Sequence, residues 1–504
     1  MIIERIVEGR TIFMKEVINK LADTKISTSY LFILLGVCAL MMTGYFSYAW
    51  FTVQGVQQYS VVTGNLSGSI TIGANSVAIE GAGAISYTPA TDSETVTITV
   101  TNSSDRTVKN SIYYYTLSDS SIEIGYTSDS PTIPTVEGVS VEKGKTLTYK
   151  IKINSSKGKA IKIGSSMGLN NSNLTLPSGT TAFLLLNDSI TIETLIAKAN
   201  SEDLDYNTAT DNQKNQMWAF THEATEQLAA TTDYRYIGAN PNNYVKFNDE
   251  LWRIIGVFYV DDGTGKIEKR MKIMRNETIG GYAWDYTSSG SYANEWKTAQ
   301  LNTLLNSGAY YNRTTGSYYN SSTSATSVDF TSIGLTDAAK EMIGDAKWYL
   351  GGTSTYTTSS NGLVSHFYKY ERGTTVYTNN STNWIGKVGL IYPSDYGYAT
   401  SGGSSTNRAG CMTKEMYNWK QALAASSETD CVNNDWLYKS DTMWSIMHNS
   451  RSTYFVFHID GFSGSVVSTN SLATCNVYPV VYLKSTIKIT SGTGSSDSPY
   501  VLAQ

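Results

Sequence analysis

An uncharged apolar stretch near the N-terminus constrains this chain most. Residues 30–51 read YLFILLGVCALMMTGYFSYAWF and contain no charged side chain. At 1.5 Å of helical rise per residue, about 20 apolar residues cross the hydrocarbon core of a bilayer. Tyr45, Tyr48 and Trp50 lie at one end of the stretch, where an aromatic belt meets the membrane surface. The sequence therefore predicts a transmembrane helix or signal anchor over residues 29–52.

The charges on either side of this stretch predict its orientation. Residues 1–28 carry five Lys or Arg against four Asp or Glu, whereas the rest of the chain has an acidic excess. By the positive-inside rule, this N-terminal segment stays in the cytoplasm and the C-terminal part is exported. Two outcomes remain open: a single-pass protein of the cell membrane, or a secreted protein whose leader is cleaved near residues 47–49. Bulky Tyr and Phe flank the small residues there, which favours the anchor.

The composition fits an exported, β-rich protein. Only 16% of the 504 residues are charged, where about 25% is usual, whereas 36 are Tyr. The abundant aromatic residues exclude a disordered chain. A net charge of −5 without any Lys/Arg run excludes binding to nucleic acid by charge. Hydroxyl and amide side chains keep such a surface soluble, as in exposed extracellular proteins.

The exported part is predicted to contain two folded units. In residues 53–185, segments such as SETVTITVTNSS and KTLTYKIKIN alternate apolar and polar residues about every ten positions, which is typical of a β-sandwich. Residues 186–235 have helical spacing and are predicted as a helical connector. Residues 236–486 are predicted as an α+β head, followed by a Gly/Ser-rich tail over 487–504.

Local patterns within the head predict particular elements. Asp261–Gly265 is acidic and Gly-rich between two strand-like runs, which predicts a hairpin turn. NEWKTAQLNTLLNSGAYY predicts an amphipathic helix, and Thr336 is the expected N-cap of a second helix. The apolar face of the first helix would hold Trp296, Leu301, Leu304 and Leu305.

The cysteines are consistent with export. Cys411 and Cys431 bracket a polar insert and are predicted to form a disulfide, which would stabilise the fold by about 3 kcal/mol through loop closure. A zinc site is the competing interpretation, but no CxxC or paired His accompanies the pair. Cys38 lies in the apolar stretch. Cys475 is left as a free thiol or as a swapped partner.

Metal and catalytic motifs give no positive signal. His222 is predicted on a solvated helix face, and none of the four His has a ligand-like spacing. Residues 203–214 begin like a calcium loop but place Thr208 and Lys214 where Gly and Glu are required. Residues 434–436 hold the residues of a lectin-type calcium strand in another order, so calcium-dependent sugar binding stays an alternative. GxSxG, P-loop and GxGxxG motifs do not occur. We predict no catalytic residue, no metal and no cofactor.

The stretch from Trp444 to Asn476 is the candidate binding region. It is rich in Tyr, Ser, Asn and Gly, which adaptable binding surfaces use. The alternative is an ordinary antiparallel hairpin whose aromatic residues only cover a sheet. The residues expected to contact a ligand are Tyr454, His458, Asp460, Phe462 and Asn470.

Two resemblances extend this interpretation. TGYFSYAWFTVQG, VVTGNLSGSITI and VTITVTNSSD, within residues 40–155, resemble the start of secreted sandwiches of the camelysin and biofilm-fibre type. This resemblance implies an exported β-sandwich and favours cleavage of the leader. YIGANPNNYVKFNDELWRIIGVF, WYLGG, YERGTTVY, GLIYPSDYGYATSGG, CVNNDWLY and YPVVYLK, in that order over residues 230–490, resemble uncharacterised surface-protein domains of gut-associated low-GC Gram-positive bacteria.

The end of those domains resembles the C-type-lectin-like fold of formylglycine-generating enzymes and of retroelement-diversified ligand-binding proteins. This chain departs from the pattern at two motifs. Of W-x-L-S/R-P only Trp444 is kept, and residues 476–480 lack the Gly and Arg of G-V-R-P-V/A. The catalytic Cys pair of the enzymes has no counterpart, so the resemblance implies a non-catalytic member.

Together these observations predict a mainly β protein with an N-terminal transmembrane helix, a β-sandwich and a C-type-lectin-like α+β head. The expected function is that of a membrane-anchored bacterial surface protein, adhesin-like, whose head binds an extracellular protein or glycan. A structural subunit of the cell envelope or of a fibre is the first alternative, and an envelope hydrolase is the second. The oligomeric state and the ligand are left open.

Overall fold

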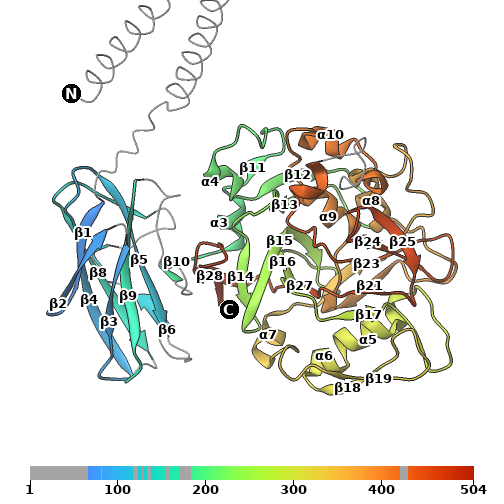
Figure 1. Ribbon diagram of the computed structural model, residues 1–504, viewed down its shortest axis with the longest axis horizontal. Coiled ribbons are helices and arrows are strands. Elements are labelled where there is room, and N and C mark those ends of the chain that lie inside the picture. Colours follow the sequence, from blue (N-terminus) through green and yellow to red (C-terminus); the bar gives the residue numbers. More distant parts are fainter. Residues whose placement is uncertain are drawn as a thin grey trace, which may run out of the picture. The chain divides into compact units, whose positions relative to one another are not determined.

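The computed structural model shows a mainly β protein with several sheets (Figure 1). The predicted anchor at residues 29–52 lies outside the described residues, as does the segment before it. In the part of the chain that is described, no helix is long and apolar enough to cross a membrane. The described residues are 66–80, 82–116, 123–127, 129–132, 138–154, 158–169, 183–419 and 430–503.

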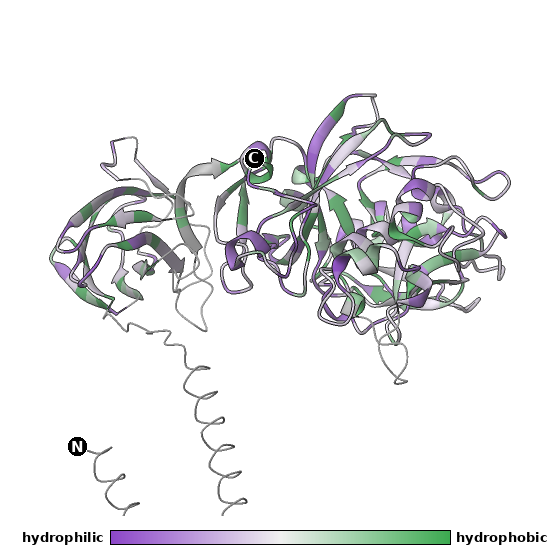
Figure 2. Cartoon of the chain, turned by 90° about the horizontal axis from the view of Figure 1, so that it is seen from above, coloured by the Kyte–Doolittle hydropathy of each residue, from purple (hydrophilic) through white to green (hydrophobic). Residues whose placement is uncertain are grey.

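Nine strands form an antiparallel ladder in the N-terminal part, in the order β6-β8-β4-β1-β2-β3-β9-β5-β7. The strands are β1 (Ser67–Ile72), β2 (Asn75–Glu80), β3 (Ala82–Tyr87), β4 (Ser93–Asn102), β5 (Val108–Thr116), β6 (Glu123–Tyr126), β7 (Val139–Val141), β8 (Thr146–Asn154) and β9 (Ile161–Gly168). Apolar and polar positions alternate along them, and Figure 2 shows this as alternating colours. One core collects buried Ile residues from both halves of the ladder, including Ile98 of β4 and Ile163 of β9.

The next strand, β10 (Phe183–Ile190), pairs in two directions. Its first residues pair with β5, and Leu185 and Ile190 pair with β28 (Lys488–Ser491) near the C-terminus. β29 (Tyr500–Ala503) then pairs with β28 and, in parallel, with β14. Residues 487–504, predicted as a tail, thus contribute two strands to the fold. Their Gly and Ser residues form the turn between β28 and β29.

A central sheet organises the C-terminal part. Its strands pair in the order β11-β12-β13-β15-β16-β27-β22, and β14 pairs with β15. The strands are β11 (Asn200–Ser201), β12 (Trp218–His222), β13 (Thr231–Arg235), β14 (Tyr244–Phe247), β15 (Glu250–Asp261), β16 (Ile267–Arg275), β22 (Val388–Gly389) and β27 (Val480–Tyr482).

The predicted helical connector is largely absent. Residues 186–235 contain only two short helices, α3 (Ile192–Ile196) and α4 (Asp211–Lys214), and otherwise contribute strands. Residues 218, 220 and 222 of β12 are buried, so the burial follows the two-residue period of a strand. The apolar residues whose spacing predicted a helix therefore lie in the strands β12 and β13.

The predicted hairpin turn is confirmed. β15 and β16 are joined through Asp261–Gly265, where the Asp261 Oδ1 accepts the backbone N–H groups of Gly263 and Gly265 at 2.9 and 3.0 Å. Both glycines have φ near +90°, which side chains with a Cβ rarely adopt.

A second sheet has the order β17-β26-β23-β24-β25. Its strands are β17 (Gly281–Ala283), β23 (Met443–His448), β24 (Phe455–Ile459), β25 (Val466–Asn470) and β26 (Thr474–Asn476). Two small hairpins pair β18 (Thr315–Tyr318) with β19 (Thr326–Asp329) and β20 (Ala346–Tyr349) with β21 (Asn383–Gly386).

Short helices surround these sheets. They are η2 (Trp296–Thr298), α5 (Gln300–Asn306), α6 (Ala309–Asn312), α7 (Asp337–Met342), α8 (Val364–Glu371), α9 (Pro393–Ala399), α10 (Arg408–Met412), η3 (Met416–Asn418) and α11 (Asp430–Asn433). The predicted apolar face is buried on η2 and α5, and the Thr336 side chain caps α7 by accepting the Ala339 N–H at 3.1 Å. The Cys411–Cys431 disulfide is confirmed, and Cys475 is a buried free thiol.

Candidate functional site

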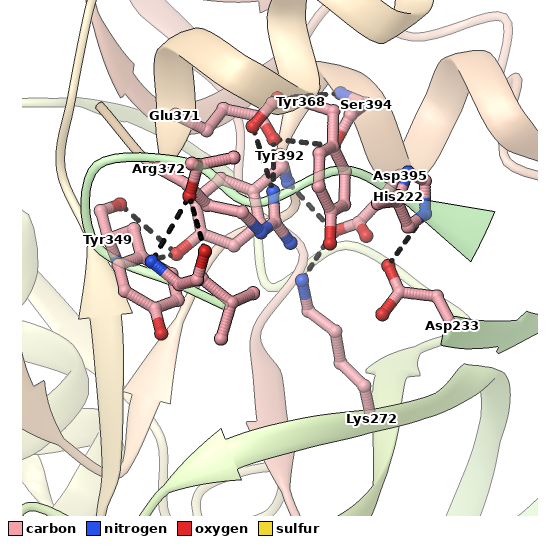
Figure 3. Close-up of polar contacts among 12 residues, drawn as sticks. His222, Asp233, Lys272, Tyr349, Tyr368, Glu371, Arg372, Tyr392, Ser394 and Asp395 are labelled. Carbon is pink, nitrogen blue, oxygen red and sulfur yellow. Dashed lines mark hydrogen bonds and ion pairs between the residues drawn. The ribbon is translucent and has the colours of Figure 1, made fainter. Parts of the chain in front are cut away.

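A group of charged side chains is buried where the central sheet meets α8 and α9 (Figure 3). Each is at most 3% exposed. Sequence reasoning missed the group, although Lys272 stands between Met271 and Ile273 in an otherwise apolar run. We call it the buried charge network, and its six members are Asp233 and Arg235 of β13, Lys272 of β16, Glu371 of α8, the following Arg372, and Asp395 of α9.

Asp395 holds the centre of this network. Its Oδ1 accepts from Arg235 at 2.9 Å, and its Oδ2 accepts from Lys272 and from the backbone N–H of Tyr392. Burial alone would raise the pKa of Asp395, but Lys272 and Arg235 lower it below its usual value. Burial also lowers the pKa of Lys272 to about 8, with Asp395 opposing the shift. The carboxylate thus joins β13 and β16 to the first turn of α9.

His222 lies at the edge of the network and corrects the sequence prediction. It is 8% exposed on β12 rather than solvated on a helix, its ring stacks on Tyr368 at 3.7 Å, and its Nε2 lies 3.3 Å from the Asp233 carboxylate. Burial lowers the pKa of His222, and Asp233 partly offsets this. Asp233 also pairs with Arg235 at 2.9 Å.

The other side of the network is held by α8. Glu371 accepts from Arg372 at 2.9 Å and from the backbone N–H of Ser394 at 2.8 Å. Burial raises the pKa of Glu371 to about 7, although Arg372 and Ser394 lower it. The Arg372 guanidinium lies 3.6 Å from the centre of the Tyr368 ring, in a cation–π arrangement.

The network is inaccessible to ligands larger than a water molecule. A crevice with about 270 Å³ of empty space, part of it open to solvent, reaches Asp233 and Arg372 between Tyr349 and Tyr482. Inside, it has room for about one water molecule. Burial moves the pKa values of Glu371 and Lys272 toward neutrality, but neither side chain has any exposed surface. We therefore interpret the network as a framework that fixes the sheet against α8 and α9.

The five predicted ligand contacts do not form one site. β24 and β25 form a hairpin with its turn at residues 460–465. Tyr454 and Asn470 lie at the open end of this hairpin, whereas Asp460 and Phe462 lie at the turn.

The two residues at the turn have different environments. The Asp460 carboxylate accepts the Phe462 N–H at 3.2 Å and the Ser463 hydroxyl at 2.6 Å, so it stabilises the turn. Phe462 is 71% exposed.

Two further candidates support the hairpin itself. His458 is 8% exposed and meets Trp444 edge-on at 5.9 Å, and burial lowers its pKa to about 4. Asn470 accepts the Leu472 N–H at 3.3 Å through its side-chain oxygen. Of the five residues, Tyr454 and Phe462 have side chains that solvent reaches and that are not fixing a turn.

Tyr454 belongs to a group of half-buried rings that sequence reasoning missed. Its ring lies 6.1 Å from that of Tyr292, which in turn stacks on Tyr286 at 6.1 Å. We call Tyr286, Tyr292 and Tyr454 the tyrosine surface. Only the motif Y-T-S-S-G-S-Y over residues 286–292 could have pointed to it, because Tyr454 is brought there by the pairing of distant strands.

The two segments that resemble calcium-binding motifs, residues 203–214 and 434–436, do not form a cluster of metal ligands. Asp435 is 4% exposed and its Oδ1 accepts the Leu437 N–H at 2.8 Å, while Trp436 is in the core and donates to the Tyr236 carbonyl at 3.0 Å. Asp205 accepts the Asn207 N–H at 3.0 Å within its own loop. Among the residues that the structure describes, no three His, Cys, Asp or Glu side chains lie where they could hold a metal ion.

Comparison of the chain with protein-family models, curated proteins and solved structures finds no match. The motif resemblances to surface-protein domains therefore stay predictions.

Proposed function

We propose that the protein is an exported, membrane-anchored surface protein whose C-terminal part binds an extracellular ligand without transforming it. The tyrosine surface is the observation that carries this proposal. It presents three half-buried rings from two separate segments, and rigid amphipathic Tyr rings are common at binding surfaces. It also includes Tyr454, which the sequence already favoured.

Two further features support this proposal. The Cys411–Cys431 disulfide is typical of proteins that mature in an oxidising, extracytoplasmic compartment. The described carboxylates that gather in the buried charge network are sealed from substrate, which favours binding over an envelope hydrolase. The fold we propose is a β-sandwich over residues 53–185 and a C-type-lectin-like head in the C-terminal part, anchored through residues 30–51.

Binding by the full chain tests the proposal. The protein would be reconstituted in nanodiscs and applied to arrays of extracellular glycans and surface proteins. We expect saturable binding of a ligand that is recovered chemically unchanged. Failure of the folded protein to bind any class, or release of a cleaved product, would contradict it.

A further inference from the structure

We propose that the tyrosine surface is a carbohydrate-binding site that takes the pyranose rings of an uncharged polysaccharide. This inference rests on the proposed function and names the ligand class and the residues that contact it.

The first part of the surface is a closed turn. Tyr286 and Tyr292 flank residues 287–291, where the Thr287 N–H donates to the Ser291 carbonyl at 2.9 Å and the Ser291 N–H donates to the Thr287 hydroxyl at 3.1 Å. These bonds place the two Tyr side by side, so their rings are within 9° of parallel. Gly290, with φ of +77°, closes the turn.

The second part comes from the loop before β24. The Tyr454 ring stands at 73° to that of Tyr292, and the Phe455 ring packs against the Tyr454 ring with its centre 4.8 Å away. Two nearly parallel rings therefore lie next to a third ring that is almost perpendicular to them. A ligand bound in the angle between these rings would contact the face of one ring and the edge of another.

Buried hydrogen bonds fix the two loops to each other. The side-chain amide of Asn294, which is 1% exposed, donates to the carbonyls of Ser452 and Phe455, each at 2.9 Å. The backbone N–H of Asn294 donates to the Thr453 carbonyl at 2.8 Å. The loops thus hold their positions before a ligand arrives, which lowers the entropy cost of binding.

Ser471 and Asp285 add a second connection. The Ser471 carbonyl accepts the N–H groups of Trp284 and Asp285, while its own N–H donates to the Tyr454 carbonyl at 2.7 Å. The Asp285 carboxylate accepts the backbone N–H groups of Ala293 and Gln300 at 2.8 and 2.9 Å. Asp285 is therefore engaged in shaping the loop, and its side chain is buried beneath the surface.

The chemistry of the surface matches a neutral sugar. Residues 286–292 contain no charged side chain, and Ser289 and Ser291 are exposed beside the rings. The C–H face of a pyranose stacks on an aromatic ring, and its hydroxyls can bond to serine and threonine. A nucleic acid would need a basic groove along its backbone, whereas residues 449–455 supply a single cation, Arg451. A stable protein interface buries roughly 800 Å² on each partner, more than one turn and one loop residue offer.

Binding of defined glycans to the full chain tests the inference. The probes are cello-, chito- and malto-oligosaccharides and mannan as uncharged glycans, with heparin as the charged comparison, measured by calorimetry in nanodiscs. We expect at least one uncharged glycan to bind saturably and heparin not to bind. Tyr292→Ala and Tyr454→Ala should each weaken that binding about tenfold, because each removes one stacking face.

Two matched variants make the result specific. Tyr454→Phe keeps the ring and should bind within about threefold of the unchanged protein. Phe462→Ala removes the exposed ring at the opposite end of the hairpin and should bind like the unchanged protein. Circular dichroism and melting temperature of each variant show whether it remains folded.

Three results would overturn the inference. Tyr292→Ala and Tyr454→Ala binding the glycan like the unchanged protein would place the site elsewhere but leave the proposed function intact. Capture of a surface protein, with no glycan bound, would reject the ligand class alone. If the protein bound neither the extracellular glycans nor the surface proteins, the inference and the proposed function would both be rejected.

Discussion

Asp395 is the residue on which the buried charge network depends. Its carboxylate pairs with both Arg235 and Lys272, and all three side chains are at most 1% exposed. Asp395→Asn removes the anion from the buried Lys272 and leaves Arg235 with its pair to Asp233, so we expect the free energy of unfolding to fall by about 3–5 kcal/mol. Urea unfolding followed by tryptophan fluorescence measures it.

Asp337→Asn is the control for this prediction. Asp337 pairs with Lys340 at 3.0 Å, but its side chain is 96% exposed, so its loss should cost less than about 1 kcal/mol. Equal unfolding midpoints for Asp395→Asn and Asp337→Asn would show that the buried pairing contributes no more than a surface pair.

His448 makes the fold sensitive to acid. It is 3% exposed, its Nε2 accepts the Tyr377 N–H at 3.2 Å, and burial lowers its pKa from 6.5 to about 4. Between these two pH values the unfolded chain binds more protons than the folded one, so stability falls as pH falls from 6.5 to 4. The contribution reaches about 3 kcal/mol at pH 4.

His448→Gln should remove this part of the pH dependence, because Gln keeps an acceptor for the Tyr377 N–H and does not titrate. The measurement is the melting temperature from pH 4 to 7. An unchanged slope in His448→Gln would contradict the assignment.

At the scale of elements, the turn between β28 and β29 shows why the C-terminal residues belong to the fold. Gly492 has φ of +92°, and a Cβ there would lie 2.1 Å from the Pro499 carbonyl oxygen. Gly265 in the β15–β16 turn has nearly the same φ, +93°, with no atom within 4 Å of such a Cβ.

Gly492→Ala should therefore destabilise more than Gly265→Ala. Both variants pay about 1–2 kcal/mol for the left-handed backbone, but only Gly492→Ala must also push two backbone segments apart. Melting temperatures of the two proteins measure the difference. If residues 487–504 were a tail, Gly492→Ala would melt like the unchanged protein.

Elements set by neighbouring residues could be predicted from the sequence. The Asp261–Gly265 turn, the Thr336 cap and the Cys411–Cys431 disulfide each depend on chemistry within about 20 residues. β28 was missed because its partner β10 lies in a distant part of the sequence. β12 pairs with the neighbouring β13 but was predicted as part of a helix, because apolar spacing alone does not separate a short strand from a helix.

The candidate site was missed for the same reason. Tyr454 was predicted, but Tyr286 and Tyr292, which lie in the loop after β17, could not be assigned to the same site by spacing. The buried charge network likewise joins Lys272 to Asp395 across 123 positions of sequence. A lone charge within an apolar strand predicts a buried partner without identifying it.

At the scale of the whole molecule, the disulfide provides a test of export. Glutathione and thioredoxin keep thiols reduced in the cytoplasm, so Cys411 and Cys431 should be oxidised only if the part that contains them leaves it. In the full chain isolated from its producing cell and denatured without reductant, we expect neither of these cysteines to react with an alkylating reagent. Mass spectrometry of the peptides identifies which thiols have reacted.

Deletion of residues 1–52 should keep the chain in the cytoplasm and leave both cysteines free to react. Cys475, a buried free thiol, should react in both denatured proteins and serves as the internal control. An oxidised Cys411–Cys431 pair in the truncated protein would mean that the bond forms without export. The disulfide would then give no support to the predicted anchor. A reduced pair in the full chain would contradict export itself, and with it the proposal that the tyrosine surface meets extracellular glycans.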